Sequence, residues 1–144
     1  MTTNITSQFQ AKVLVPGSGS GLALVLAEPL SLWGGLNPES GEIIDKRHPQ
    51  AGQIVTNRVL VLPSGRGSSS ASSILLEAVK QGTAPAAIIT SETDGILALG
   101  AAVAREMYDQ APPVLVLDRE AYSHLQTGQQ ISVTETGLLT VSAS

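Results

Sequence analysis

Three short apolar runs, separated by stretches of helical pattern, form the centre of this sequence. Residues 58–62, 86–90 and 114–117 are rich in Val, Leu, Ile and Ala, which is typical of buried strands. Between these runs, apolar residues recur at helical spacing in residues 74–81 and 96–107. This alternation predicts three parallel strands with helices packed on them.

The N-terminal part of the sequence predicts a hairpin. Residues 1–10 are polar, and we expect them to be frayed. Residues 11–15 and 22–27 have the pattern of strands, and the segment between them contains three glycines. Pro29 follows too closely for a helix of useful length, so these glycines favour a hairpin turn over a nucleotide-binding loop.

The C-terminal part predicts a short helix and a second hairpin. Residues 118–126 have the pattern of a helix that Asp118 caps. Residues 130–134 and 138–142 alternate around a Glu-Thr-Gly turn, which is typical of two antiparallel strands. The predicted fold class is therefore α/β, with a central, partly parallel sheet, packed helices and flanking hairpins.

Residues 30–49 are dense in turn-forming residues. Trp33 is the only tryptophan; we expect it in the core, with a place in an interface as the alternative. Asp45, Arg47 and His48 cluster in the same segment. Because Asp45 and His48 are too few ligands for a metal ion, we expect a solvated loop there.

The most distinctive stretch is a turn over residues 63–73, between the first buried strand and a helix that Gly82 ends. Gly65 and Gly67 allow positive φ or a close approach to a ligand. The serines can cap the helix, whose unpaired first amides form an anion site. Arg66 adds a guanidinium that suits a carboxylate or a phosphate. The turn is therefore a candidate anion-binding site.

Two familiar motifs do not fit this turn, and a plain alternative stays open. The sequence contains no G-x-x-x-x-G-K-[ST], so the turn is not a P-loop. Gly65-Arg66-Gly67-Ser68 also lacks the second flanking glycine of a G-x-S-x-G nucleophile elbow. The alternative is an ordinary serine-rich helix start that binds nothing.

Composition narrows the class of protein. The 144 residues are expected to form one domain, residues 1–144. Only 14% of the residues are charged, which favours a surface partly covered by a partner. A net charge of −4 without a basic run argues against binding to nucleic acid.

The apolar runs are too short for a membrane span and no signal-peptide pattern is present, so we expect a cytoplasmic protein. With no cysteine, any metal must be held mainly by another chain.

Several motifs together resemble the swivel domain, or small subunit, of aconitase X, over about residues 11 to 118. They lie at residues 31–38 (SLWGGLNP), 41–45 (GEIID), 48–49 (HP), 63–70 (PSGRGSSS) and 84–89 (APAAII). The resemblance implies a swivelling β/β/α fold that closes over a large subunit. It also implies that this partner holds an iron–sulfur cluster or iron through its own cysteines, and that the iron acts as a Lewis acid.

The resemblance also implies roles for the residues of the turn. In the wider aconitase superfamily, the serine of a glycine-serine turn is the catalytic base, and by position this residue is Ser68. Gly67, Ser69 and Ser70 are then expected to bind substrate, together with Arg66. Aconitase proper has an arginine two residues after its serine, where this sequence has Ser70, and Arg66 is the candidate substitute.

The implied reaction is dehydration of a small hydroxy acid, by removal of a proton next to a carboxylate and loss of a β-hydroxyl. Members of the family act on cis-3-hydroxy-L-proline or on mevalonate 5-phosphate. The low content of Lys and Glu argues against a hyperthermophile, so we place hydroxyproline first. A non-enzymatic anion-binding module is the other alternative. A phosphohistidine carrier is disfavoured because the turn contains no histidine.

Overall fold

The computed structural model describes residues 6–67 and 69–142 as eight strands and four helices. The strands are β1 (Thr6–Gln10), β2 (Lys12–Val15), β3 (Gly19–Val25), β4 (Val59–Leu62), β5 (Ala87–Thr90), β6 (Val114–Val116), β7 (Gln130–Val133) and β8 (Leu138–Ser142). The helices are α1 (Leu32–Gly35), α2 (Ser70–Gln81), α3 (Gly95–Tyr108) and α4 (Arg119–Tyr122). None of these helices has the length and apolar character that crossing a bilayer requires.

The predicted parallel strands form the middle of the sheet. Its strand order is β1-β8-β7-β3-β4-β5-β6-β2. β4, β5 and β6 pair in parallel as predicted, with α2 and α3 as the connections between them. The C-terminal half of β3 adds a fourth parallel strand beside β4. The closing hairpin is also confirmed, because β7 and β8 pair in antiparallel fashion around Gly137, which has a φ of +88°.

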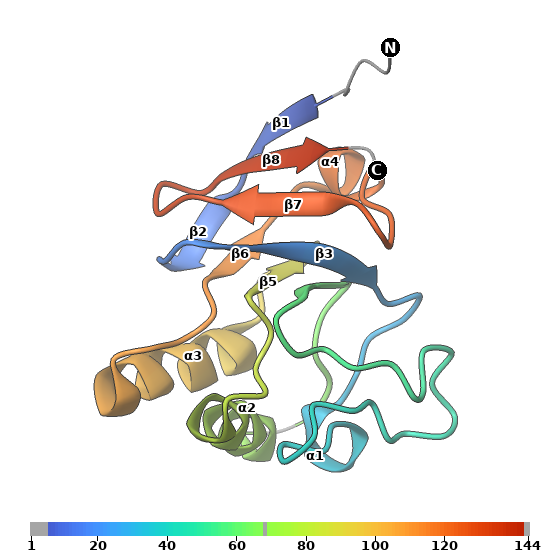
Figure 1. Ribbon diagram of the computed structural model, residues 1–144, viewed down its shortest axis with the longest axis vertical. Helices are drawn as coiled ribbons and strands as arrows, with labels where there is room; N and C mark the ends of the chain where they lie inside the picture. Colours follow the sequence, from blue (N-terminus) through green and yellow to red (C-terminus); the bar gives the residue numbers. More distant parts are fainter. Residues whose placement is uncertain (1–5, 68, 143–144) are drawn as a thin grey trace.

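The sheet folds back on itself because its two end strands are consecutive in the chain. β1 pairs with β8 at one end of the sheet and β2 with β6 at the other, yet only Ala11 separates β1 from β2. The result is two layers of strands with α1, α2 and α3 on one side, the expected β/β/α arrangement, while the short α4 lies near β8 (Figure 1). Residues 6–10 were expected to be frayed, but they form β1, because β8 offers them a free edge.

Alternating residues of the parallel strands fill two separate cores. Leu60, Ile88 and Val114 face the helices and pack with α2 and α3. Val61 and Ile89 face the other way, into a core enclosed by the two strand layers. All five side chains are buried. The parallel strands therefore satisfy the prediction of burial on both faces, and they form a rigid base for the turns that leave their ends.

The predicted N-terminal hairpin is wrong. β2 and β3 do not pair with each other: β2 joins β6, while β3 joins β7 and β4. The cause lies in two of the glycines, which belong to β3 rather than to a turn. A Cβ on Gly19 would lie 2.4 Å from the Ala86 carbonyl oxygen, and one on Gly21 would lie 2.4 Å from that of Asn57. These glycines let other backbone segments approach the strand closely.

We expect Gly21→Ala to lower the free energy of unfolding by about 1–3 kcal/mol, because its methyl group would collide with a backbone oxygen that cannot move freely. Urea denaturation followed by circular dichroism measures this change. Gly95→Ala is the matched control, since no atom lies within 4 Å of the added Cβ there. Equal stability of both variants would contradict the close approach at Gly21.

Candidate active site

The candidate site lies where β4 ends. Residues 63–69 leave the carboxyl end of this strand and lead into α2, and the neighbouring parallel strand β5 ends at the same edge. In open α/β sheets, ligands bind at this edge. The position of the turn therefore agrees with its predicted role.

Backbone contacts on both sides hold the first half of the turn. The Pro63 carbonyl accepts hydrogen bonds from the amides of Ser91 and Glu92 at 3.3 and 3.2 Å. The Arg66 amide donates to the Leu30 carbonyl at 3.1 Å. The turn is therefore packed between the segment after β5 and the segment that precedes α1.

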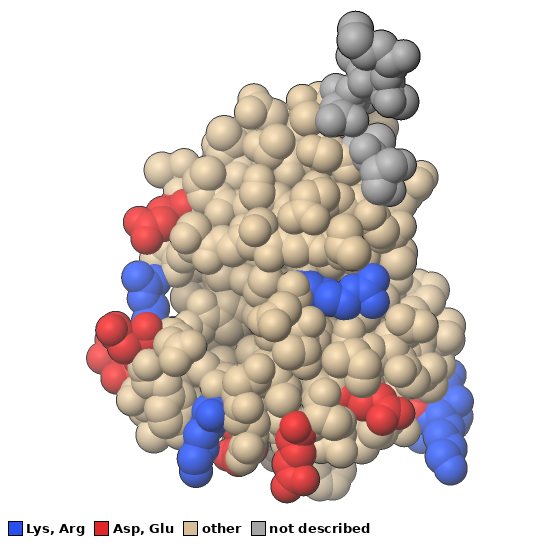
Figure 2. All heavy atoms as spheres, viewed as in Figure 1, with Lys and Arg blue, Asp and Glu red and all other residues tan. Residues whose placement is uncertain are grey.

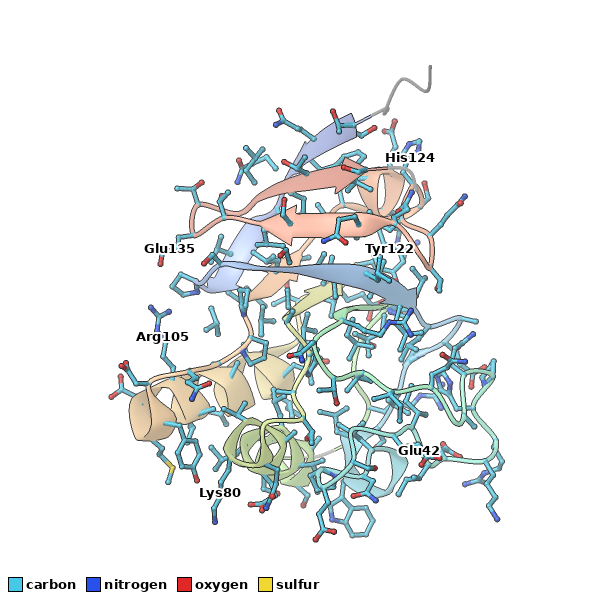
Figure 3. All side chains as sticks on the ribbon, viewed as in Figure 1. Glu42, Lys80, Arg105, Tyr122, His124 and Glu135 are labelled. Carbon is cyan, nitrogen blue, oxygen red and sulfur yellow. The ribbon has the colours of Figure 1, made fainter. Side chains whose placement is uncertain are left out.

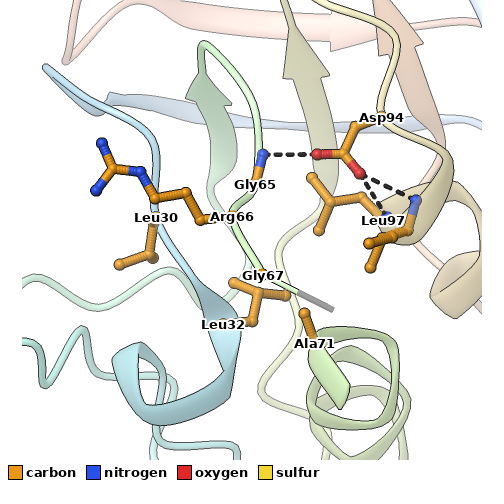
Figure 4. Close-up of a pocket in the computed structure, with 9 residues that line it drawn as sticks. Leu30, Leu32, Gly65, Arg66, Gly67, Ala71, Asp94 and Leu97 are labelled. Atoms are coloured by element: carbon orange, nitrogen blue, oxygen red, sulfur yellow. Dashed lines mark hydrogen bonds between the residues drawn. The ribbon is translucent and has the colours of Figure 1, made fainter. Parts of the chain in front are cut away.

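Asp94 forms the shortest of these contacts. Its Oδ2 accepts a hydrogen bond from the Gly65 amide at 2.6 Å (Figure 4). Its Oδ1 accepts from the amides of Ile96 and Leu97 at 3.0 and 2.9 Å, so Asp94 is also the N-cap of α3. One amide of the predicted anion site is thus already occupied by a carboxylate of the same chain.

The second half of the turn is more open. Gly67 has a φ of +99°, and a Cβ there would lie 3.2 Å from Ser31 Oγ. Ser69 is exposed and precedes α2 without forming a side-chain cap, and Ser70 is the first residue of the helix. Ser68 lies outside the described residues. Arg66, Gly67, Ser69 and Ser70 therefore lie at or just before the start of α2, and the Ser69 side chain does not cap this helix. Their role in binding substrate stays a prediction.

Arg66 differs from other arginines of the chain in how it is used. Arg58 and Arg105 donate hydrogen bonds to backbone carbonyls, Arg105 toward Pro16 at 2.6 Å (Figure 3). The Arg66 side chain is exposed and extends away from Asp94 (Figure 4). Within residues 6–67 and 69–142, its guanidinium has no ion pair or hydrogen bond. Its donor fork is therefore available to a ligand or a partner.

A small cavity of about 30 Å³ lies beside the turn. It is lined by Leu30, Leu32, Gly65, Arg66, Gly67, Ala71, Asp94, Ile96 and Leu97 (Figure 4). This volume is about enough for one water molecule. A small hydroxy acid needs more room, so a substrate at this turn must lie largely outside the cavity, between the turn and another surface.

Trp33 is exposed near this turn, which makes the core prediction wrong. Its side chain is 64% accessible, because Trp33 and Gly34 depart from helical dihedral angles within α1 and turn the ring outward. Ser31, which contacts the region of Gly67, donates a hydrogen bond to the Trp33 carbonyl at 3.1 Å. The alternative of an interface residue therefore gains support.

The expected solvated loop is only partly solvated. Arg47 is 96% exposed and forms a loose ion pair of 3.9 Å with Asp45. His48, in contrast, is buried: its Nδ1 accepts from the Gln50 amide at 3.0 Å and its Nε2 lies 3.1 Å from the Glu28 carbonyl. Burial with both ring nitrogens engaged makes His48 a structural residue of this loop.

The described part of the chain offers no site for iron. The sequence has no cysteine, and the described residues contain no group of three or more His, Asp or Glu that could hold a metal ion. On the face shown in Figure 2, charged side chains lie singly and basic ones form no patch. Away from the turn, in α4, burial raises the pKa of the Tyr122 hydroxyl to about 12.

Asp94 is a residue of the candidate site that the sequence analysis did not identify. Its contact with Gly65 spans 29 positions, which no local pattern reveals. A signal did exist, because Gly65 and Asp94 each follow one of two predicted parallel strands that are consecutive in the chain. Such strands usually lie side by side, so that the turns after them meet.

The fold and the turn define a class: a small β/β/α domain whose candidate site lies in an exposed turn at the end of a central parallel strand. Comparison with known proteins agrees. A family model of the aconitase X swivel domain matches residues 8–141. The crystal structure of Thermococcus kodakaraensis aconitase X superposes with a TM-score of 0.84 and 29% identity, over 94% of this chain and 98% of that one.

Sequence relatives carry two enzyme names. The cis-3-hydroxy-L-proline dehydratase of Pseudomonas aeruginosa is 48% identical over 106 residues, which are 74% of this chain and 18% of that protein. The phosphomevalonate dehydratase small subunit of Methanothermobacter thermautotrophicus is 40% identical over 97 residues, which are 67% of this chain and 74% of that one.

The chain belongs to the aconitase X swivel domain family, as its motifs predicted. It spans only about a fifth of the length of the cis-3-hydroxy-L-proline dehydratases that it matches, 18% of one and 21% of another.

Proposed function

We propose that this chain is the small subunit of an aconitase X-type hydro-lyase that dehydrates a small hydroxy acid, and that it works only with a large subunit. The observation that carries the proposal is the turn after β4. It presents an arginine whose guanidinium has no partner among residues 6–67 and 69–142, beside a cavity of about 30 Å³ that is too small for a substrate and calls for a facing surface. Family membership and the enzyme names of the relatives support the same function.

Ser68 is the proposed catalytic base. In the reaction, its oxygen takes the proton from the carbon next to the substrate carboxylate, the C–H electron pair forms the C=C bond, and the β-hydroxyl leaves. A serine hydroxyl is a weak base, so its deprotonated form needs positive charge in a site closed to water. Arg66 and the start of α2 are the groups of this chain that supply such a field. The iron is assigned to the large subunit.

We expect Ser68→Ala, assembled with the large subunit, to lower kcat by about 100- to 10,000-fold, the usual effect of losing a general base. Steady-state assays on the purified pair measure this loss. Ser73→Ala is the matched control, because Ser73 is exposed on α2 and its hydroxyl bonds only to the Ser70 carbonyl at 2.7 Å. Normal turnover of the Ser68 variant would remove Ser68 from the mechanism.

Arg66 is proposed to bind the substrate carboxylate, together with backbone or hydroxyl groups of Gly67, Ser69 and Ser70. Its planar donor fork suits a carboxylate, and no group of the described chain competes for it. We expect Arg66→Ala to raise KM by about 10- to 100-fold, since hydrogen bonds to charged groups contribute about 1.5–3 kcal/mol. Arg66→Lys should recover part of this loss. An unchanged KM in the alanine variant would argue against contact with substrate.

Trp33 is proposed to contact the large subunit. Ser31 links the backbone of Trp33 to the turn, because its hydroxyl donates to the Trp33 carbonyl at 3.1 Å and a Cβ on Gly67 would lie 3.2 Å from the same hydroxyl. A partner surface that covers the turn would therefore also lie close to Trp33. Exposed tryptophans are frequent anchors of protein interfaces. The low proportion of charged residues in the chain agrees with a partly covered surface.

We expect Trp33→Ala to weaken assembly with the large subunit by about 30-fold or more, as loss of an interface anchor does. Because the ring is exposed, the melting temperature of the variant chain should change little. Calorimetric titration of the two subunits measures the affinity. Met107→Ala, a change at a residue that is 60% exposed near the end of α3, is the control. Equal affinities of both variants would exclude Trp33 from the interface.

The substrate is proposed to be cis-3-hydroxy-L-proline, with mevalonate 5-phosphate as the alternative. The relative that carries the first name is 48% identical, and the small subunit that carries the second is 40% identical. Reconstitution with the large subunit and iron under anaerobic conditions, followed by assays of both compounds, decides between them. If neither compound reacts and the isolated chain binds a small carboxylate or phosphate through Arg66, the chain is an anion-binding module instead.

A further inference from the structure

Asp94 serves two elements at once. Its Oδ1 caps α3 by accepting from Ile96 and Leu97, while its Oδ2 accepts the Gly65 amide at 2.6 Å. Capping a helix needs only one acceptor oxygen, and serine, threonine or asparagine does this as well as aspartate. The second oxygen of Asp94 therefore has a separate task, which is to hold the turn after β4.

The turn is also attached to the start of α3 at a second point. Ser72, in the first turn of α2, donates a hydrogen bond from its Oγ to the Ile96 carbonyl at 2.8 Å. Gly100 allows the two helices to approach closely, because a Cβ there would lie 3.0 Å from the Ser72 carbonyl oxygen. Gly65 and Ser72, on either side of Arg66 and Gly67 in the chain, are thus both attached to the same helix start.

Of these two attachments, the one at Gly65 is decisive for the orientation of Arg66. The Gly65 amide donates to Asp94, and the next amide, that of Arg66, donates in the other direction to the Leu30 carbonyl. Two successive amides are thus fixed by opposite sides of the turn. Without the Asp94 carboxylate, the Gly65 amide would lose its partner and the peptide between Ser64 and Gly65 would be free to rotate, which leaves the Leu30 contact as the remaining one of the two that hold the backbone at Arg66.

We propose that Asp94 is a positioning residue of the active site, which acts through Gly65 to orient Arg66 toward the substrate. This inference rests on the proposed function and adds a residue to it. Because small displacements of reacting groups cost large factors in rate, loss of the Gly65 contact lowers kcat more than it raises KM.

The test uses two variants of Asp94 in the assembled pair of subunits. Asp94→Ser keeps a cap for α3 but is too short to reach Gly65 as well. Asp94→Asn keeps the shape, but its single oxygen serves one element only, and its NH₂ group faces the amides of the other. Asp118→Ser is the matched control, because Asp118 caps α4 through the Ala121 amide at 2.8 Å and does not line the cavity.

Three quantities are measured for each variant: kcat, KM, and the rate of amide hydrogen exchange in a peptide covering residues 63–67. We expect both Asp94 variants to lower kcat by about 100-fold with a smaller change in KM, and to speed exchange in that peptide. The Asp118 variant should match the unaltered protein in all three. The melting temperatures of all variants should be similar.

The following outcomes would overturn the proposal for Asp94 or the proposed function. Normal kcat and normal exchange in Asp94→Ser would overturn the proposal, as would a loss of kcat that only follows a fall in melting temperature and is equal in Asp118→Ser. If the unaltered pair turns over neither substrate, the proposed function fails. In that case the exchange rates still test whether Asp94 holds the turn. Unchanged exchange in the Asp94 variants would refute this role of Asp94.

Discussion

The parallel pairing of β4 with β5 is the interaction on which the candidate site depends. Its register places Leu62 opposite Thr90, so the chain leaves both strands at the same edge of the sheet. Only this register brings the Pro63 carbonyl within reach of Ser91 and the Gly65 amide within reach of Asp94. A slip by one residue would also turn every buried side chain of these strands to the wrong face.

Side-chain packing in the two aliphatic cores stabilises that register. Leu60 and Ile88 pack against the helices, whereas Val61 and Ile89 pack into the layer formed by the folded-back strands. Because apolar burial on both faces specifies the alignment, the turn itself can remain polar and partly exposed. The candidate site therefore consists of an exposed turn held by buried strands, which is common where a fold positions functional loops.

The sequence alone predicted the parts of the fold that local patterns control. The runs at residues 58–62, 86–90 and 114–117, the closing hairpin and the end of α2 at Gly82 were confirmed, because burial and turn chemistry leave clear local signals. The pairing of β3 was not predicted. Its glycines resemble a turn, and only the distant segments at Asn57 and Ala86 explain why glycine is needed there.

The same limit applies to the site. The composition of residues 63–70 identified the turn, but two properties depend on contacts between segments far apart in the chain: the burial of His48, whose ring contacts the Glu28 carbonyl, and the double role of Asp94. Such contacts become visible only once strand order is known.

The closed arrangement of the strands has one more consequence. Thr6 pairs directly with Ser142, so the two ends of the described chain meet as neighbours, on the side of the molecule away from α1 and α2 (Figure 1). Residues 6 and 142 offer neighbouring points of attachment on that side of the molecule. The domain can therefore be joined covalently to another polypeptide through its N-terminus or its C-terminus with the same geometry, and a short linker between residues 6 and 142 would produce a circular permutant with the same strand order.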